Sequence, residues 1–170
     1  MRPRILLIGY GNPGRGDDGL GPALAAKVEA LGLPGVTVES DYQLMVDHAA
    51  QIAAHDLVIF ADAMIGLAQP YQFAPIEQIQ PLGLGSHQVT PEAALALAEL
   101  LFGKAPAGWM LAIAGQAFGE VKEGLSPAAQ TNLAEALTFL QGWISQLGTT
   151  SPVQPISVPQ PHLARRSRGA

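Results

Sequence analysis

A short apolar run that leads into a cluster of glycines opens the chain and restricts what it can fold into. Residues 4–9 read RILLIG, and residues 9–14 hold three glycines and a proline. Because the run is short and glycine follows at once, it favours a buried parallel strand over a helix. Residues 20–33 then space their leucines and valine for one apolar face of a helix. A strand, a tight turn and a helix in this order form the opening unit of an α/β domain.

The same alternation of strand and helix signals continues along the chain. Thr-Pro at 90–91 and Ser-Pro at 126–127 mark helix starts, because the hydroxyl caps free N–H groups and proline suits the first turn. A proline near the end of residues 71–76 suits an edge strand. Strands are expected at 36–40, 56–63, 71–76 and 108–115, and helices at 45–55, 90–102 and 126–147. This order predicts an α/β domain with a mainly parallel sheet, whose ligands bind at the carboxyl ends of the strands.

Composition excludes several classes of protein. With 170 residues, 48% of them hydrophobic and 14% charged, the chain can bury a large core and is not disordered. Its formal net charge of -5 argues against a nucleic-acid partner, which needs a basic face. The absence of cysteine removes disulfides, thiolate metal sites and cysteine nucleophiles, and favours a reducing compartment. No serine has an evident partner base, so covalent catalysis is not expected.

One domain and a tail are expected. Residues 1–147 predict a single α/β domain, and residues 148–170 predict a flexible C-terminal tail, since they hold four prolines and three arginines but no acidic residue. The first apolar run, of about five residues, is too short for a signal peptide. No apolar stretch approaches the roughly 20 residues that span a bilayer. We therefore expect a cytoplasmic protein that does not contact membranes.

The glycine cluster also matches a nucleotide-binding pattern. Residues 9–14, GYGNPG, fit the GxGxxG turn of dinucleotide-binding domains, and they follow a strand and precede a helix. Asp17 and Asp18 come directly afterwards and would repel a pyrophosphate. Glu39 and Asp41 come later than the acidic residue expected about 20 positions on, which binds the ribose. Dinucleotide binding by a Rossmann-like domain therefore ranks second.

The adjacent carboxylates of Asp17 and Asp18 lie at the start of the first expected helix. One carboxylate at this position can cap free backbone N–H groups and is favoured by the helix dipole. Successive helical residues point about 100° apart, so the two cannot fill the same role. We therefore assign Asp17 to capping or to holding the loop in shape, together with Asn12, and Asp18 to a functional site.

Two further polar residues lie at the end of an expected strand and in a loop. Asp62 follows the apolar residues of the third strand, at the edge where α/β domains place their ligands, and is either a turn cap or a functional group. His87 lies in a glycine-rich loop, where presentation to a ligand explains it better than packing does. The other histidines are expected outside the site: His48 and His55 on the surface, and His162 in the tail.

Asp18, Asp62 and His87 are far apart in the sequence, but an α/β sheet would bring their loops to one rim. Two carboxylates and an imidazole suit a borderline divalent metal such as nickel or zinc. No local motif such as HExxH strengthens this interpretation, so the spacing alone is a weak signal. Such a metal would polarise a carbonyl or lower the pKa of a water, and a carboxylate could instead act directly as general base.

Four motifs, in the correct order, resemble the [NiFe] hydrogenase maturation proteases. Residues 9–21, GYGNPGRGDDGLG, resemble the family's N-terminal signature, G-x-G-N followed by Asp-Asp or Asp-Glu and then glycine. FADA around Asp62, SHQ around His87 and GLSPAAQ at 124–130 resemble the second acidic motif, the histidine motif and the C-terminal region. The resemblance covers roughly residues 4–145, and the four motifs together are far more specific than any one.

The resemblance implies a three-layer α/β/α sandwich of the phosphorylase/hydrolase-like type, with a five-stranded, mostly parallel sheet and one antiparallel strand. It also implies an aspartyl-type endopeptidase that removes the C-terminal peptide of a nickel-loaded large-subunit precursor during maturation. Asp18, Asp62 and His87 match the family's metal-contacting trio and would bind nickel carried by the precursor, without a tightly bound organic cofactor. A monomer with that precursor as its partner is expected. A nickel-sensing chaperone that does not cut the precursor is the remaining alternative.

One segment departs from the family pattern. Many members carry an Asp-Gly-Gly-Thr-like segment after the second strand, where this chain reads ESDYQL. Asp41 keeps the acidic position, but the glycines are absent. This segment bears on which large subunit is recognised and on how its C-terminal peptide lies in the cleft.

Overall fold

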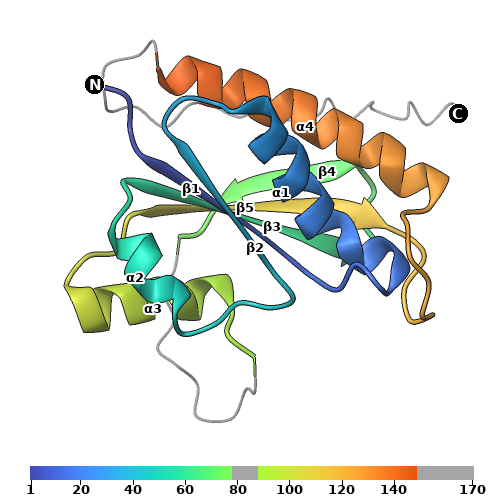
Figure 1. Ribbon diagram of the computed structural model, residues 1–170, viewed down its shortest axis with the longest axis horizontal. Coiled ribbons are helices and arrows are strands. Elements are labelled where there is room, and N and C mark those ends of the chain that lie inside the picture. The colour runs from blue at the N-terminus through green and yellow to red at the C-terminus, as the bar shows by residue number, and fades with distance from the viewer. Residues whose placement is uncertain (78–87, 149–170) are drawn as a thin grey trace, which may run out of the picture.

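The computed structural model describes residues 1–77 and 88–148, and its elements alternate along the chain as expected. The strands are β1 (Ile5–Tyr10), β2 (Val36–Asp41), β3 (Leu57–Ile65), β4 (Tyr71–Pro75) and β5 (Ala107–Gly115). The α-helices are α1 (Leu20–Leu31), α2 (His48–Ala53), α3 (Pro91–Phe102) and α4 (Pro127–Leu147). The strands form one sheet, with α1 and α4 on one face and α2 and α3 on the other (Figure 1).

The order of strands across the sheet is β2-β1-β3-β5-β4. The first three neighbouring pairs are parallel, and only β4 runs antiparallel to its neighbour β5. Strand β4 lies at an edge and ends at Pro75, where the missing N–H breaks no sheet hydrogen bond. The predicted three-layer fold, with its single antiparallel strand, is therefore confirmed.

Alternating side chains of the central strands supply a core on each face of the sheet. In β1, Ile5 and Leu7 join the cluster beneath α1 and α4, whereas Leu6 and Ile8 join the cluster beneath α2 and α3. All four are at most 3% exposed. This burial on both faces explains why the strand appears in the sequence as an unbroken apolar run.

The predicted helix caps are present. Thr90 Oγ1 accepts the N–H of Ala93 at 3.2 Å, and Ser126 Oγ accepts the N–H of Ala129 at the same distance. One element was not predicted: a short 3₁₀ helix, η1 (Gly16–Gly19), lies between β1 and α1 and carries both adjacent aspartates. The loop between strand and helix therefore has a fixed shape of its own.

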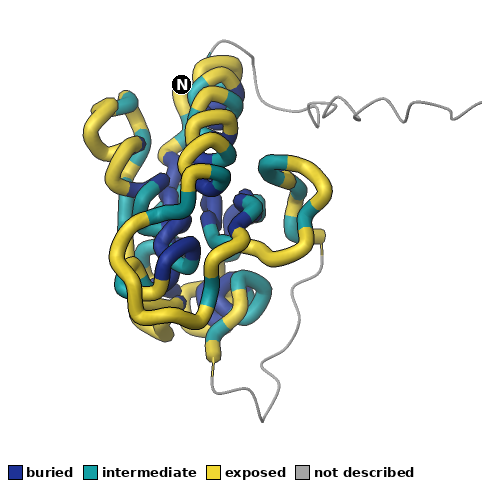
Figure 2. Tube along the Cα trace, turned by 90° about the vertical axis from the view of Figure 1, so that its right-hand side faces the viewer, coloured by how far each residue is buried: buried dark blue, intermediate teal, exposed yellow. Residues whose placement is uncertain are grey.

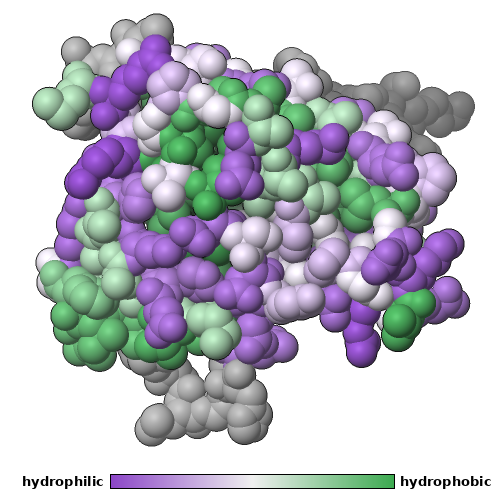
Figure 3. Space-filling model, viewed as in Figure 1, coloured by the Kyte–Doolittle hydropathy of each residue, from purple (hydrophilic) through white to green (hydrophobic). Residues whose placement is uncertain are grey.

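The two ends of the sheet differ in their surroundings. The parallel strands β1, β2, β3 and β5 all end at one edge, called the carboxyl edge below, which lies on the right of Figure 1 and faces the viewer in Figure 2. Large apolar side chains at the end of α3, Leu100, Leu101 and Phe102, are more than half exposed. They contribute to the hydrophobic surface over α3 at the lower left of Figure 3, away from the carboxyl edge.

Within the described residues, no helix combines the length and apolar character needed to cross a membrane. Residues 149–170 lie outside the described part of the chain, so the expected tail and the boundary at 147 stay predictions.

Candidate functional site

Glycines in β1, in the loop that follows it and in α1 allow close packing of the backbone. A side chain on Gly9 would overlap the carbonyl oxygen of Gly21, and one on Gly11 would overlap that of Asp18. A side chain on Gly21 would in turn overlap the carbonyl oxygens of Tyr10 and Ala61. Helix α1 therefore approaches β1 and β3 more closely than any residue with a Cβ allows. Backbone packing of α1 and of the loop against the strands is sufficient to account for these glycines.

Asp17 is fully buried and holds two distant loops together. Its carboxylate accepts hydrogen bonds from the N–H groups of Gln116 (2.8 Å), Ala117 (2.9 Å) and Ser126 (2.7 Å), and from the Ser126 hydroxyl (2.8 Å). Burial alone would raise the pKa of Asp17, but these hydrogen bonds outweigh it and lower the pKa below its ordinary value. The predicted loop-holding role is confirmed. The capping alternative is wrong, because the partners precede and open α4 and do not belong to the helix that follows Asp17.

Asp18 and Asn12 shape the loop from within. The N–H of Asn12 donates to Asp18 Oδ2 at 2.8 Å, and Asn12 Oδ1 accepts the N–H of Gly14 at 2.9 Å. Asn12 therefore stabilises the turn, as predicted. Asp18 is half-buried, and the hydrogen bond from Asn12 fixes its carboxylate within the loop.

Asp62 lies beside the end of β1, although its own strand continues to Ile65. Burial is the largest influence on its carboxyl group and raises the pKa of Asp62 to about 6. The negative charge of Asp18 raises the pKa further, so the two carboxylates are near enough to influence each other. Hydrogen bonding to the Ala63 N–H, at 2.8 Å, acts in the opposite direction.

The register of the sheet adds Tyr10 to this pair. Gly9 pairs with Ala61, so the next residues, Tyr10 and Asp62, are neighbours on the face covered by α2 and α3. The Tyr10 hydroxyl interacts with the Asp62 carboxylate. Burial, followed by the charge of Asp62, raises the pKa of Tyr10, so its hydroxyl stays protonated. Sequence reasoning missed Tyr10, although its place at the end of the first strand was a usable signal.

Asp41 and His48 lie beside Tyr10, on the side of β1 away from Asp62. Asp41 pairs directly with Tyr10 in the sheet, and His48 Nε2 lies 4.0 Å from Asp41 Oδ2. His48 is only 7% exposed, so the expectation that it lies on the surface is wrong. The expected helix spanned residues 45–55, whereas α2 begins at His48, whose side chain is among the buried residues of the helix. There His48 Nδ1 accepts the N–H of Met45 at 2.8 Å, which leaves the proton of the neutral ring on Nε2.

The third predicted site residue, His87, lies outside the described residues. Among the residues that are described, no three acidic, histidine or cysteine side chains gather closely enough to hold a metal ion. Asp18 and Asp62 supply two carboxylates. Glu92, in the first turn of α3, is close enough for its charge to raise the pKa of Tyr10, so this helix begins near the two carboxylates.

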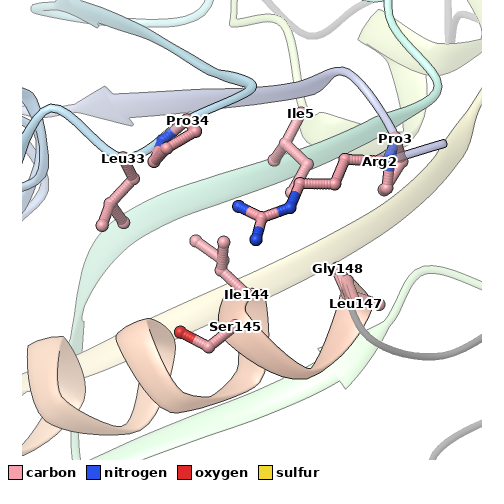
Figure 4. A pocket seen from close by; sticks show the side chains of 9 residues that line it. All are labelled: Arg2, Pro3, Ile5, Leu33, Pro34, Ile144, Ser145, Leu147 and Gly148. Carbon is pink, nitrogen blue, oxygen red and sulfur yellow. The ribbon is translucent and has the colours of Figure 1, made fainter.

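Two hollows of the surface differ from this site. One, of about 50 Å³, lies at the opposite edge of the sheet, between the start of β1 and the end of α4 (Figure 4). Its lining includes Arg2, Ile5 and Ile144 but no acidic residue or histidine, and its volume is below that of usual ligand sites. The other, of about 300 Å³, is lined by the loop after β1 and by Gly124 and Leu125.

The chain is therefore a three-layer α/β protein with two neighbouring carboxylates, Asp18 and Asp62, near the carboxyl edge of its sheet. Solved structures with this fold include the [NiFe] hydrogenase maturation protease HycI from Thermococcus kodakarensis KOD1, with a TM-score of 0.65 and 20% identity over 85% of this chain and 94% of that one. The hydrogenase maturating endopeptidase HybD from E. coli has a TM-score of 0.61 and 21% identity over 85% and 94% of the two chains.

An uncharacterised protein from Wolinella succinogenes is also similar, with a TM-score of 0.59 and 24% identity over 86% of this chain and 99% of that one. No family model and no curated protein sequence matches the chain. The chain therefore has the fold of hydrogenase maturation proteases, as its motifs predicted.

Proposed function

We propose that this protein is an endopeptidase that removes the C-terminal peptide from a nickel-loaded [NiFe] hydrogenase large-subunit precursor. The observation that carries the proposal is the pairing of Asp18 and Asp62 at the carboxyl edge of a fold shared with hydrogenase maturation proteases. A buried carboxyl group such as Asp62, with a raised pKa, is typical of functional sites. We further propose that the enzyme acts in the cytoplasm as a monomer.

In this proposal, nickel belongs to the substrate. Asp18, Asp62 and His87 bind the metal that the precursor carries, so that a precursor without nickel does not dock productively. Carboxylate oxygens and an imidazole nitrogen are suitable ligands for such a borderline metal. The pairing of Asp18 with Asp62 supports this donor set, and a cation between the two carboxylates would offset their mutual repulsion.

Two routes to cleavage follow from the carboxylate pair. Asp62 acts as general base towards a water in the first route, for which a pKa of about 6 is close to the ideal near neutral pH. In the second, the substrate-borne metal polarises the scissile carbonyl or activates the water. The chain has no cysteine, which removes a thiol nucleophile from consideration.

Mass spectrometry of the precursor before and after incubation tests the proposal. The wild-type protein is expected to shorten a nickel-loaded precursor by one C-terminal peptide and to leave the nickel-free precursor intact. Asp18→Ala, Asp62→Ala and His87→Ala should each abolish or strongly slow the reaction. Glu29→Ala, an exposed change on α1, is the matched control and should cleave normally. Full activity in all three site variants would sink the site assignment.

The same experiment separates the alternatives. A nickel-sensing chaperone would bind the precursor without changing its mass. A dinucleotide-binding protein would gain thermal stability with NAD, because a ligand that binds only the native state stabilises it. Gly9 and Gly11 pack closely against backbone carbonyl oxygens, and the Asp18 carboxylate lies in the same loop. Both observations disfavour dinucleotide binding.

A further inference from the structure

Tyr10 ends β1, and its backbone is held from both sides of that strand. It pairs with Asp41 of β2 on one side, while the preceding Gly9 pairs with Ala61 of β3 on the other. The next residue, Gly11, donates its N–H to the carbonyl of Asp41 at 3.1 Å. The tyrosine ring packs against the apolar cluster beneath α2 and α3. A strand in the middle of the sheet therefore fixes the place from which the hydroxyl acts.

The Tyr10 hydroxyl has one proton to donate and two carboxylates beside it, those of Asp41 and Asp62. The oxygens of Asp41 have other partners: Oδ1 accepts the N–H of Tyr42 at 2.7 Å, and Oδ2 lies 4.0 Å from Nε2 of His48. The hydroxyl forms its hydrogen bond with Asp62. Because burial raises the pKa of Tyr10, the hydroxyl stays protonated and remains a donor.

Two donors from different strands restrain the Asp62 carboxylate. The Ala63 N–H donates to Oδ1 at 2.8 Å from β3, and the Tyr10 hydroxyl donates from β1. A carboxylate accepts about four hydrogen bonds, so these two donors leave capacity for a further partner. Asp17 differs, because its carboxylate already accepts four hydrogen bonds from the loops that it joins. Asp62 is therefore held in place without being saturated by these two donors.

The pair formed by Tyr10 and Asp62 is not explained by stability. Burial raises the pKa of Asp62 to about 6 in spite of both hydrogen bonds, so the ionised carboxylate is unfavourable to the fold at neutral pH. Two hydrogen-bonded groups can often be replaced together by apolar groups of the same shape with little loss. Control over the orientation of the carboxylate explains the tyrosine hydroxyl better than packing does.

We propose that Tyr10 is a positioning residue, whose hydroxyl holds the Asp62 carboxylate in one orientation beside Asp18 and so prepares it for the substrate. The inference rests on the proposed function, in which Asp62 acts on the precursor. Tyr10 acts through Asp62 and takes no part in the chemical step itself. Hydrogen-bond partners of a metal-binding carboxylate typically contribute roughly 10- to 100-fold to affinity or activity.

The first test is the kinetics of precursor cleavage by Tyr10→Phe, which keeps the ring and removes the donor. We expect kcat/KM for nickel-loaded precursor to fall about tenfold or more. The loss should lie in kcat if Asp62 acts as general base, and in KM if Asp62 serves only to bind the metal. Either result supports the inference, and the difference distinguishes the two routes to cleavage.

Two controls accompany this measurement. Tyr71→Phe removes a hydroxyl on the opposite face of the sheet, where Tyr71 stacks on Phe139, and should leave both kinetic constants unchanged. Far-UV circular dichroism at the assay temperature should be the same for wild type and Tyr10→Phe, so that unfolding does not account for a slower reaction. Unchanged constants in Tyr10→Phe would overturn the inference while the proposed function stands.

The second test, a double-mutant cycle on stability, does not depend on cleavage. At pH 8, where Asp62 is ionised, Tyr10→Phe should lower the equilibrium constant of folding about tenfold, measured by urea denaturation. In the Asp62→Ala background the same change should cost less than about twofold, because the acceptor is absent. An equal cost in both backgrounds would show that Tyr10 does not act through Asp62. Coupling between the two residues, together with no cleavage by wild type, would refute the proposed function and retain the positioning of Asp62.

Discussion

Asp17 and Ser126 are joined by two hydrogen bonds across 109 residues, one from the serine N–H at 2.7 Å and one from its hydroxyl at 2.8 Å. The same serine hydroxyl accepts the N–H of Ala129 and so caps α4. One buried carboxylate thereby fixes the loop that presents Asp18 and the start of the last helix.

Replacement of Asp17 by Asn is expected to destabilise the protein strongly. The amide group brings N–H donors into a place where four donors already point, so at least one buried partner loses its acceptor. We expect a loss of about 3 kcal/mol or more in the free energy of unfolding, measured by urea denaturation. Asp47→Asn, on an exposed loop, should stay within about 0.5 kcal/mol of wild type. Equal stability of the two variants would contradict the role assigned to Asp17.

Asp17 should also make the fold sensitive to acid. Its folded-state pKa is lower than the ordinary value of 3.8, so the unfolded chain binds the proton more readily. The stabilisation is therefore complete above that value and is lost as the pH falls through the folded-state pKa. The difference in unfolding free energy between wild type and Asp17→Asn should narrow below about pH 4. A difference that is constant from pH 7 to pH 3 would argue against this assignment.

Asp62→Asn should stabilise the fold at neutral pH while abolishing cleavage. The pKa of Asp62 is raised to about 6, so the folded state binds the proton more tightly than the unfolded state, and stability falls as the pH rises from about 4 to about 6. The variant lacks this pH-dependent loss. Its free energy of unfolding should therefore exceed that of wild type by on the order of 2 kcal/mol at pH 7 and by little at pH 4. Thermal unfolding at both pH values measures this, and a destabilised variant at pH 7 would refute it.

Two glycine substitutions should have opposite effects. Gly21→Ala would drive a methyl group into the carbonyl oxygens of Tyr10 and Ala61, and we expect it to prevent folding or to cost several kcal/mol. Gly142→Ala lies on the exposed side of α4 with open space around its Cβ. This substitution should raise the free energy of unfolding by about 0.5–1 kcal/mol, because alanine favours the helix. Denaturant midpoints of both variants test whether the glycines after β1 serve packing.

The sequence was sufficient to predict the fold because its signals were local. Short apolar runs marked the buried strands, Thr90 and Ser126 marked helix starts, and Pro75 marked the edge strand. Each signal acts within a few residues, so periodicity and capping rules detect it.

Contacts between residues far apart in the sequence could not be predicted from these local signals. Tyr10 adjoins Asp62 because β1 and β3 lie in a particular register, and Asp17 meets Ser126 because the loop after β1 lies beside the start of α4. His48 was assigned to the surface because it was expected to flank an amphipathic helix, but its side chain is buried and lies 4.0 Å from Asp41. The proximity of Asp18 and Asp62 was predicted from strand ends alone, whereas the grouping with His87 stays a prediction.

The buried link between Asp17 and Ser126 also has a consequence for synthesis on the ribosome. The amino-terminal loop emerges first, but its charged carboxylate has no partners until residues 116–126 have been made. A nascent chain that stops before residue 116 would hold an uncompensated charge beneath that loop, which opposes closure of the turn. Asp18 therefore reaches its final position only when the domain is nearly complete, so unfinished chains do not carry an assembled site.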